Sequence, residues 1–191
     1  LKLVGGDVSS YRSEPDDNGG SIYIYTSGGT LLLYSSIIAN NKAGDGGGIY
    51  AQGDSSNTEH TQVIINGSTI TGNQASNGYG GGLYIENSNC VLVRTEISRN
   101  TAGGGGGLYL SNDGSGTMTV DIRETTFTAN KANNNQGNEI YAEGTPTISI
   151  VNTLFNQPID SNHNFYDDSG ATWNTCANNV CTATPFLSLI H

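Results

Sequence analysis

Short runs of apolar residues recur along the chain every 28 to 32 residues. The runs are rich in β-branched side chains and are bounded by Gly, Asn, Ser or Thr residues, a pattern typical of short β-strands. We interpret residues 1–3 as the remnant of one further run. The complete runs span residues 31–33, 63–65, 91–93, 120–122 and 148–150.

Two sequence blocks repeat in a fixed order around these runs. The first is a glycine-rich run followed by Ile or Leu and then Tyr, with a degenerate last copy. Its copies end at Tyr23, Tyr50, Tyr84, Tyr109 and Tyr141. The second block has the form apolar-x-x-Asn-x-Ala. Its copies begin at Ile38, Ile70, Ile97 and Phe127.

The spacing of the blocks predicts a solenoid. Successive tyrosines of the first block lie 25 to 34 residues apart, and each repeat holds about three short strands with no helical period between them. Solenoids accept such variation because insertions bulge from the corners while the strands stay in register. A β-propeller blade needs about four strands in about 40 residues, which does not fit. We therefore predict an all-β fold, a right-handed parallel β-helix of about five to six and a half coils.

The repeats predict one β-helical domain over residues 1–156. Its coils start near Gly19, Gly46, Gly80, Gly105 and Gly137. Both blocks fail after Asn156, and residues 157–191 are interpreted as a C-terminal cap that covers the last coil. Cys176 and Cys181 lie in this segment, and we predict a disulfide between them because the chain has the character of a secreted protein.

The tyrosines of the first block are the leading candidates for binding. Side chains alternate along a strand, so the Ile or Leu should point inward and the Tyr outward. Tyr23, Tyr50, Tyr84, Tyr109 and Tyr141 should then form one exposed column. Such a column can contact a glycan or a partner protein, or its rings can stack on one another and shield the sheet. The sequence leaves both interpretations open.

The repeated asparagines are interpreted as structural. Asn41, Asn73, Asn100 and Asn130 each stand at the same place in their block. We predict an internal ladder in which each side-chain amide bonds to the next coil and satisfies buried backbone groups.

Composition narrows the range of partners. The chain has 7 basic and 17 acidic residues, a formal net charge of -10. The basic residues are too few to neutralise phosphates, so nucleic acid is excluded as a partner, and an anionic membrane surface is disfavoured for the same reason. No apolar run approaches the roughly 18 residues of a membrane-spanning helix, so direct membrane insertion is not expected.

The two blocks resemble the repeat of chlamydial polymorphic outer membrane proteins, which alternates F-x-x-N with G-G-A-[ILV]. Residues 127–130 match the first block, and the Gly-Gly-Gly-Ile and Gly-Gly-Gly-Leu runs match the second with Gly in place of Ala. The resemblance covers residues 19–156. It implies a bacterial cell-surface or secreted protein, often an adhesive passenger domain, and it is weaker evidence for function because the repeat is a scaffold.

Little in the sequence indicates catalysis or a cofactor. Glycosidases need two facing carboxylates about 5–9.5 Å apart, whereas the pairs Asp16-Asp17 and Asp167-Asp168 lie at opposite ends of the chain. Oxygen-rich loops of acidic secreted proteins can bind Ca²⁺, which makes Asp16 and Asp17 candidate ligands, with a solvated loop as the default interpretation. No other cofactor is expected.

The leading functional prediction is a non-enzymatic extracellular module that binds a glycan or a cell-surface protein through one outer face. One alternative is a structural subunit that stacks end to end with copies of itself into a filament or sheath. A second alternative is a polysaccharide-active lyase or hydrolase. A flat threonine array that binds ice is a weaker idea, because Thr71, Ser98 and Thr128 supply a fragment of one.

Overall fold

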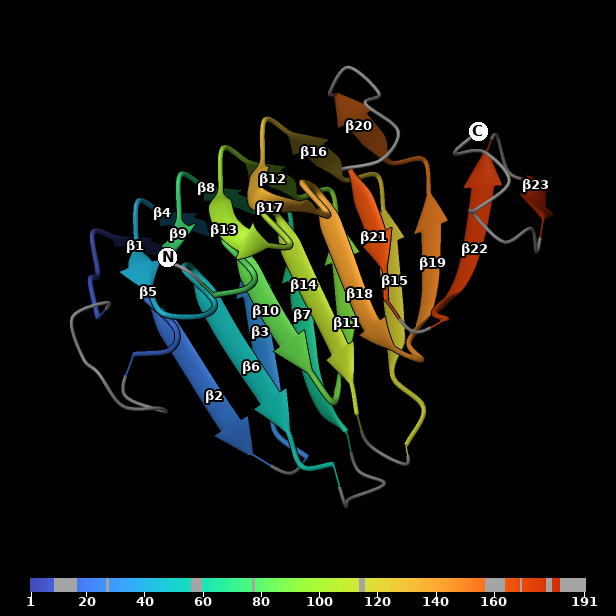
Figure 1. Ribbon diagram of the computed structural model, residues 1–191, viewed down its shortest axis with the longest axis horizontal. Helices are drawn as coiled ribbons and strands as arrows, with labels where there is room; N and C mark the ends of the chain where they lie inside the picture. The colour runs from blue at the N-terminus through green and yellow to red at the C-terminus, as the bar shows by residue number, and fades with distance from the viewer. Residues whose placement is uncertain are drawn as a thin grey trace.

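The chain folds into a β-solenoid of about five turns in which strands stack in parallel. The computed structural model describes residues 1–8, 17–26, 28–55, 60–76, 78–113, 116–156, 164–168, 170–177 and 180–182, and none of these residues is helical. Figure 1 shows the coils side by side along the long axis, with the described N-terminal coil at one end and β22 and β23 at the other. The prediction of an all-β parallel β-helix is confirmed.

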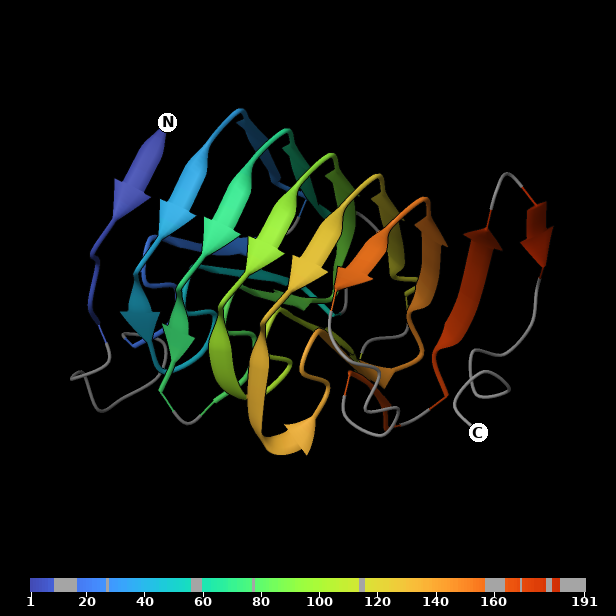
Figure 2. The same cartoon turned by 90° about the horizontal axis from the view of Figure 1, so that it is seen from above.

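Four sheets run along the stack, and a complete coil contributes one strand to each. Sheet 1, which forms a row of parallel arrows in Figure 2, contains β1 (Lys2–Val4), β4 (Ile37–Ala39), β8 (Thr69–Thr71), β12 (Glu96–Ser98), β16 (Thr126–Thr128) and β20 (Leu154–Asn156). Sheet 2 contains β2 (Ile22–Thr26), β6 (Ile49–Gly53), β10 (Leu83–Glu86), β14 (Leu108–Asn112), β18 (Ile140–Gly144) and β21 (Phe165–Asp167).

Sheets 3 and 4 complete each coil. Sheet 3 contains β3 (Thr30–Tyr34), β7 (Thr61–Asn66), β11 (Ser88–Val93), β15 (Thr119–Arg123), β19 (Thr147–Val151), β22 (Thr172–Ala177) and β23 (Val180–Thr182). Sheet 4 is a short corner sheet of β5 (Lys42–Ala43), β9 (Gln74–Ala75), β13 (Thr101–Gly104) and β17 (Lys131–Gln136). Neighbouring strands are parallel in the described stack except β22 and β23, which are antiparallel.

The first glycine of each glycine-rich run turns the chain from sheet 4 into sheet 2. Gly46, Gly80 and Gly105 have φ of 58°, 67° and 61°, the left-handed region that glycine occupies without steric cost. The following glycines have no room for a side chain. A Cβ on Gly81, for example, would come within 2.5 Å of the Gly106 carbonyl oxygen in the next coil. The repeated glycines therefore allow close approach of successive coils as well as the turn.

Columns of similar apolar side chains fill the interior. The apolar residue of the Asn block is fully buried in sheet 1. The Ile or Leu of the glycine block points inward in sheet 2, as the alternation predicts, and is fully buried in every copy except Ile22, which is partly buried. The rings of Phe127 and Phe155 stack with centroids 5.2 Å apart. These columns are Ile38, Ile70, Ile97 and Phe127 in sheet 1, and Ile49, Leu83, Leu108 and Ile140 in sheet 2.

The structure corrects the interpretation of the first residues. β1 pairs with β4, so Leu3 stands beside Ile38 of the Asn block. Residues 1–3 therefore belong to sheet 1 and are not a remnant of the alternating runs, which form sheet 3. The error arose because the run Leu-Lys-Leu carries a period of two and nothing else.

Parallel stacking also continues past the predicted boundary at residue 156. β21 pairs with β18 and β22 pairs with β19 in the same parallel register as the earlier coils. The residues Asn164, Phe165 and Tyr166 stand beside Glu139, Ile140 and Tyr141, so they are a sixth, strongly diverged copy of the glycine block. Residues 157–163 and 183–191 of the predicted cap lie outside the described residues.

Candidate functional site

The five predicted tyrosines lie in one column on the outward face of sheet 2. The strand register places each beside the next, and Tyr166 of β21 adds a sixth ring. Centroids of neighbouring rings are 4.5 to 5.3 Å apart. The rings are stacked or tilted from Tyr23 to Tyr109 and turn edge to face from there to Tyr166. We call these six residues the tyrosine column.

The tyrosine column is largely closed to solvent, in contrast to the exposed column expected from the sequence. Tyr50, Tyr109 and Tyr141 are 6%, 3% and 4% exposed, Tyr84 is half-buried, and Tyr23 is 39% exposed. Each ring lies against its neighbour, so the faces that would stack on a sugar are covered within the column. The geometry is that of the second interpretation, in which the rings shield the sheet.

Tyr79 adds a seventh ring to this cluster, and neither repeated block contains it. Its ring stacks on Tyr109 with centroids 4.7 Å apart and meets Tyr141 edge to face. Gly104 stands beside Tyr79 in the next coil, and a Cβ there would come within 3.0 Å of the ring. A tyrosine directly before a glycine run, followed one coil later by a glycine, is the sequence signal that could have revealed it.

Carboxylates two residues after the tyrosines hold the hydroxyl ends of the column. The Tyr84 hydroxyl donates to Glu86 Oε2 at 3.1 Å, and the Tyr50 hydroxyl donates to the same atom at 3.4 Å. Tyr109 donates to Glu143 in the same way. Burial raises the pKa of Glu86, and burial followed by the Glu86 charge raises the pKa of Tyr84. These acids therefore hold the column in place.

The open part of this face lies on its first strand. Tyr25, two residues after Tyr23 on β2, is 67% exposed. The same position holds Gln52 in the next coil and Glu86 in the one after. Tyr23 and Tyr25 are thus the accessible end of the tyrosine column, and we call this pair the aromatic edge.

The four repeated asparagines form a continuous buried ladder. Asn73 Nδ2 donates to Asn100 Oδ1 at 3.0 Å, and Asn100 Nδ2 donates to Asn130 Oδ1 at 3.0 Å. Each Oδ1 also accepts the backbone N–H of the preceding asparagine, while each Nδ2 donates to a carbonyl of the previous coil, as Asn100 does to Ile70. Asn41 joins through the same bonds to Asn73. The ladder joins the turns of neighbouring coils.

Two different residues end this ladder. At the N-terminal side Gly6 stands beside Asn41, and its backbone N–H donates to Asn41 Oδ1 at 2.9 Å. At the other side Asn130 Nδ2 donates to Glu139 Oε2 at 2.5 Å, and Glu139 is fully buried. Glu139 occupies the third glycine position of the degenerate glycine block. The sequence shows that this copy of the block is degenerate, but not that Glu139 ends the asparagine ladder.

A second buried ladder of hydroxyl groups lies at the corner between sheets 3 and 1. Each hydroxyl donates to the carbonyl two residues earlier, as Thr95 does to Val93 at 3.0 Å, and the Ser68 hydroxyl also accepts the Ser36 N–H of the previous coil. The signal in the sequence is a Ser or Thr two residues before each apolar residue of the Asn block. The members are Ser36, Ser68, Thr95, Thr125 and Thr153.

The remaining predicted site residues are the candidate Ca²⁺ ligands, Asp16 and Asp17, and the cysteine pair near the C-terminus. Asp16 lies outside the described residues, and the backbone carbonyl of Asp17 accepts the Gly44 N–H at 2.5 Å. Across the described ranges, no three His, Cys, Asp or Glu side chains are grouped as a metal site requires. Cys176 and Cys181 stand opposite each other in the register of β22 and β23, and the disulfide stays a prediction.

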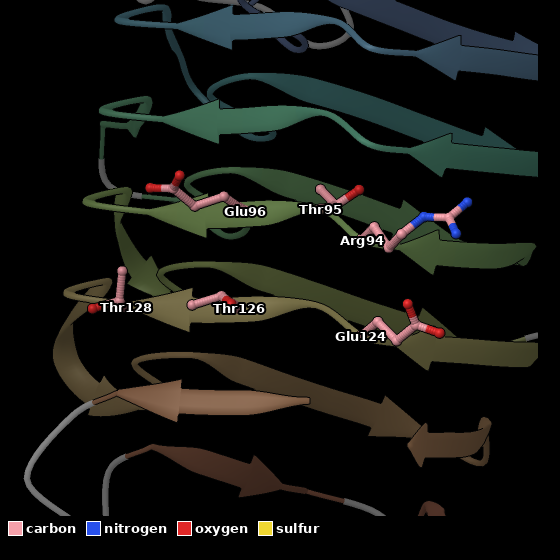
Figure 3. Close-up of a pocket in the computed structure, with 6 residues that line it drawn as sticks. All are labelled: Arg94, Thr95, Glu96, Glu124, Thr126 and Thr128. Atoms are coloured by element: carbon pink, nitrogen blue, oxygen red, sulfur yellow. The ribbon is translucent and has the colours of Figure 1, made fainter. Parts of the chain in front are cut away.

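A polar depression of about 380 Å³ lies on the outward side of sheet 1, between two neighbouring coils. Arg94, Thr95 and Glu96 come from one coil, and Glu124, Thr126 and Thr128 come from the next (Figure 3). Arg94 and Glu124 occupy one end and Glu96 the other. The depression appears only when the coils are stacked, because its two halves come from neighbouring coils. We call these six residues the inter-coil depression.

Comparison with known proteins identifies the repeat. Residues 35–52 match the family model of the Chlamydia polymorphic membrane protein (Chlamydia_PMP) repeat. This segment of the chain is similar to that repeat. No curated protein and no solved structure matches the chain.

The matched polymorphic membrane protein repeat coincides with the structural unit of the ladder. Residues 35–52 run from the corner before β4 to β6 and contain Ile38, Asn41 and the turn at Gly46. The later coils repeat the same bonds with Asn73, Asn100 and Asn130. The repeat and the solenoid together indicate a surface-associated or outer-membrane-associated repeat protein. The described residues contain no helix long and apolar enough to cross a membrane.

Proposed function

We propose that this chain is a non-catalytic module of the bacterial surface that binds a glycan or a cell-surface protein through the aromatic edge, Tyr23 and Tyr25. The observation that carries the proposal is the 67% exposure of Tyr25 beside Tyr23, at the end of a column whose other rings are largely covered. An exposed aromatic pair supported on a rigid stack offers apolar area at a small cost in side-chain entropy.

The residues that occupy the position of Tyr25 in the other coils support Tyr25 as the binding residue. The position of Tyr25 carries Gln52, Glu86, Ser111 and Glu143 in the following coils, so the fold does not require an aromatic residue there. Tyr23, in contrast, stacks on Tyr50 with centroids 5.3 Å apart and supports the column. Tyr25 is therefore the residue whose side chain is best explained by a partner outside the chain.

The test replaces Tyr25 with the residue that the next coil uses. Beads coated with the full chain or with the Tyr25→Gln variant are applied to host-cell monolayers and to printed glycan arrays. We expect binding to fall about tenfold in the variant, the loss of about 1.4 kcal/mol from one buried aromatic contact. Far-UV circular dichroism should be unchanged because Gln52 already occupies this position.

Tyr34→Asn is the matched control, since Tyr34 is 57% exposed on sheet 3 and Asn66 follows it in the register. Equal loss in both variants, or full binding by Tyr25→Gln, would show that the aromatic edge is not the binding face. Incubation of the chain with polysaccharides should release no reducing ends, and turnover would overturn the non-catalytic role.

A second candidate is end-to-end assembly of copies of this chain. β1, β2 and β3 each stand at the end of their sheet in the described stack, and edge strands can pair with another chain. Sedimentation velocity over a hundredfold concentration range, with negative-stain microscopy, tests this idea. A concentration-independent monomer would rule it out, whereas filaments would favour it over the aromatic edge.

A further inference from the structure

The inter-coil depression is a built polar site on a different face from the aromatic edge. It lies over β12 and β16, whose register places Glu96 beside Thr126. Adjacent parallel strands are about 4.8 Å apart, so the two rows of side chains in Figure 3 are close enough to contact one small ligand together.

The charged groups of the depression do not neutralise one another. Arg94 Nη2 donates to Asn66 Oδ1 at 3.2 Å, and within the described part of the chain it makes no ion pair with Glu96 or Glu124. Glu96 Oε1 accepts the Ser98 hydroxyl at 2.7 Å, which fixes one oxygen of that carboxylate. Arg94, Glu96 and Glu124 are all exposed residues of the lining.

The corners that carry Arg94 and Glu124 share the left-handed backbone of the other coils. Arg94 and Glu124 have φ of 46° and 49°, in the left-handed region. The equivalent corner residues of the other coils are Ser35, Gly67 and Asn152. Long charged residues in this region carry a steric cost that glycine avoids and asparagine tolerates. The side chains of Arg94 and Glu124 are therefore held at fixed corners of neighbouring coils, where both line the depression.

The chemistry of the lining selects the class of ligand. A guanidinium donates, carboxylates accept, and threonine hydroxyls do both, which matches a ligand with many hydroxyl groups. The lining has two carboxylates and one guanidinium, and the whole chain has a net charge of -10, so an anionic ligand is repelled. We propose that the inter-coil depression binds a neutral oligosaccharide, with Arg94 and Glu124 holding hydroxyls at one end and Glu96 at the other. This inference rests on the proposed surface-binding role.

The experiment uses four hexasaccharides as probes: chitohexaose, cellohexaose and mannohexaose, with hexagalacturonate as the anionic comparison. Binding to the full chain is measured by saturation-transfer NMR and calorimetry. At least one neutral probe should bind, and hexagalacturonate should bind more weakly. Arg94→Asn and Glu124→Asn should each weaken that binding about tenfold or more, since each removes a charged hydrogen-bonding group. Asn152 shows that the corner accepts asparagine.

Arg99→Asn is the matched control. Arg99 is also an arginine with positive φ on the same coil, it does not line the depression, and Asn40 occupies the equivalent corner. This variant should bind the neutral probe within twofold of the unchanged chain. Absence of binding by every neutral probe, preference for hexagalacturonate, or an equal effect of Arg99→Asn would overturn the assignment.

The two proposals fail in different ways. If the depression is not a glycan site, Arg94→Asn and Glu124→Asn will leave cell binding unchanged while Tyr25→Gln still reduces it. If the surface-binding role is wrong, the unchanged chain will show no cell binding, whatever the hexasaccharide probes do.

Discussion

Single residues in the left-handed region make the corners of this solenoid. The corner between sheets 1 and 4 carries Asn40, Gly72, Arg99 and Ala129 in successive coils, with φ of 56°, 66°, 53° and 57°. Asparagine and glycine adopt this conformation readily, because asparagine can form a local side-chain hydrogen bond and glycine has no Cβ. Alanine has a Cβ and no polar side-chain group. Ala129 is therefore the residue whose backbone cost is least compensated.

Replacing Ala129 with glycine should stabilise the protein. We expect the Ala129→Gly variant to gain about 0.5–1 kcal/mol in unfolding free energy, because the relief of the left-handed alanine exceeds the extra entropy of glycine in the unfolded chain. Urea unfolding followed by circular dichroism measures this difference.

Ala132→Gly supplies the control for that substitution. Ala132 is a buried strand residue of β17 outside the left-handed region, so its loss should destabilise the protein. A neutral or destabilising Ala129→Gly would mean that the left-handed corner carries no strain.

The role of a residue was predictable where the residue recurs at one place in every repeat. It was not predictable where the residue ends a ladder. The four ladder asparagines recur at one place in the block, so their shared role could be read before the coils were stacked. Glu139 could not, because its role depends on the coil that follows. The sequence carries Pro158 three residues after Phe155, where the repeated block has asparagine, and Glu139 supplies the acceptor that Asn130 would otherwise lose.

At the scale of elements, we expect the buried asparagine ladder to contribute more to the free energy of unfolding than the hydrogen bonds on the outward faces do. Asn100→Ala would remove the acceptor of the Asn73 N–H and of Asn73 Nδ2, and the side-chain donor to the Ile70 carbonyl. We expect a loss of about 3 kcal/mol or more in unfolding free energy, measured by urea denaturation.

Asn89→Ala is the comparison for the ladder. Asn89 Oδ1 also accepts hydrogen bonds from the next coil, from the Thr119 N–H at 2.8 Å, but it lies on the partly exposed face of β11. Water can replace these bonds, so a loss of about 1 kcal/mol or less is expected. Equal losses in the two variants would mean that burial does not distinguish the ladder.

The tyrosine column should resist ionisation while the coils are stacked. Burial raises the pKa of Tyr84, Tyr109 and Tyr141 above the ordinary value of about 10. A group whose pKa is higher in the folded state contributes stability below its unfolded pKa, and that contribution falls as the pH rises above about 10. Absorbance at 295 nm should show these phenolates forming together with alkaline unfolding, whereas early ionisation of all ten tyrosines would contradict the buried column.

The sequence pattern predicted which segments form strands. It predicted the solvent exposure of their faces only in part. The period of two predicted the strands of sheets 2 and 3, and it placed the tyrosines on the outward side. It could not show that this side is closed, because closure depends on ring contacts between coils and on Tyr79, which lies outside the repeats. The inter-coil depression escaped prediction for the same reason, since its two halves are about 30 residues apart in sequence and meet only through stacking.

At the scale of the whole molecule, the stack protects what lies inside it. Cys90 is fully buried, and burial raises the pKa of its thiol to about 12. The folded protein should therefore show no thiol that reacts with a chromogenic disulfide reagent at pH 8. After denaturation without reductant we expect one reactive thiol, from Cys90, because Cys176 and Cys181 are predicted to be joined. Three reactive thiols would show that the predicted disulfide is absent.

The hydrogen bonds that join neighbouring coils are the same along the asparagine ladder, so whole coils can be removed or added. Asn73 and Asn100 are 27 residues apart and hold the same bonds to the coils on either side. An in-frame deletion of residues 74–100 would place Thr101 directly after Asn73 and return every later strand to a matching neighbour. The protein can therefore be shortened or lengthened by whole turns, which changes how far it reaches without redesigning its interior.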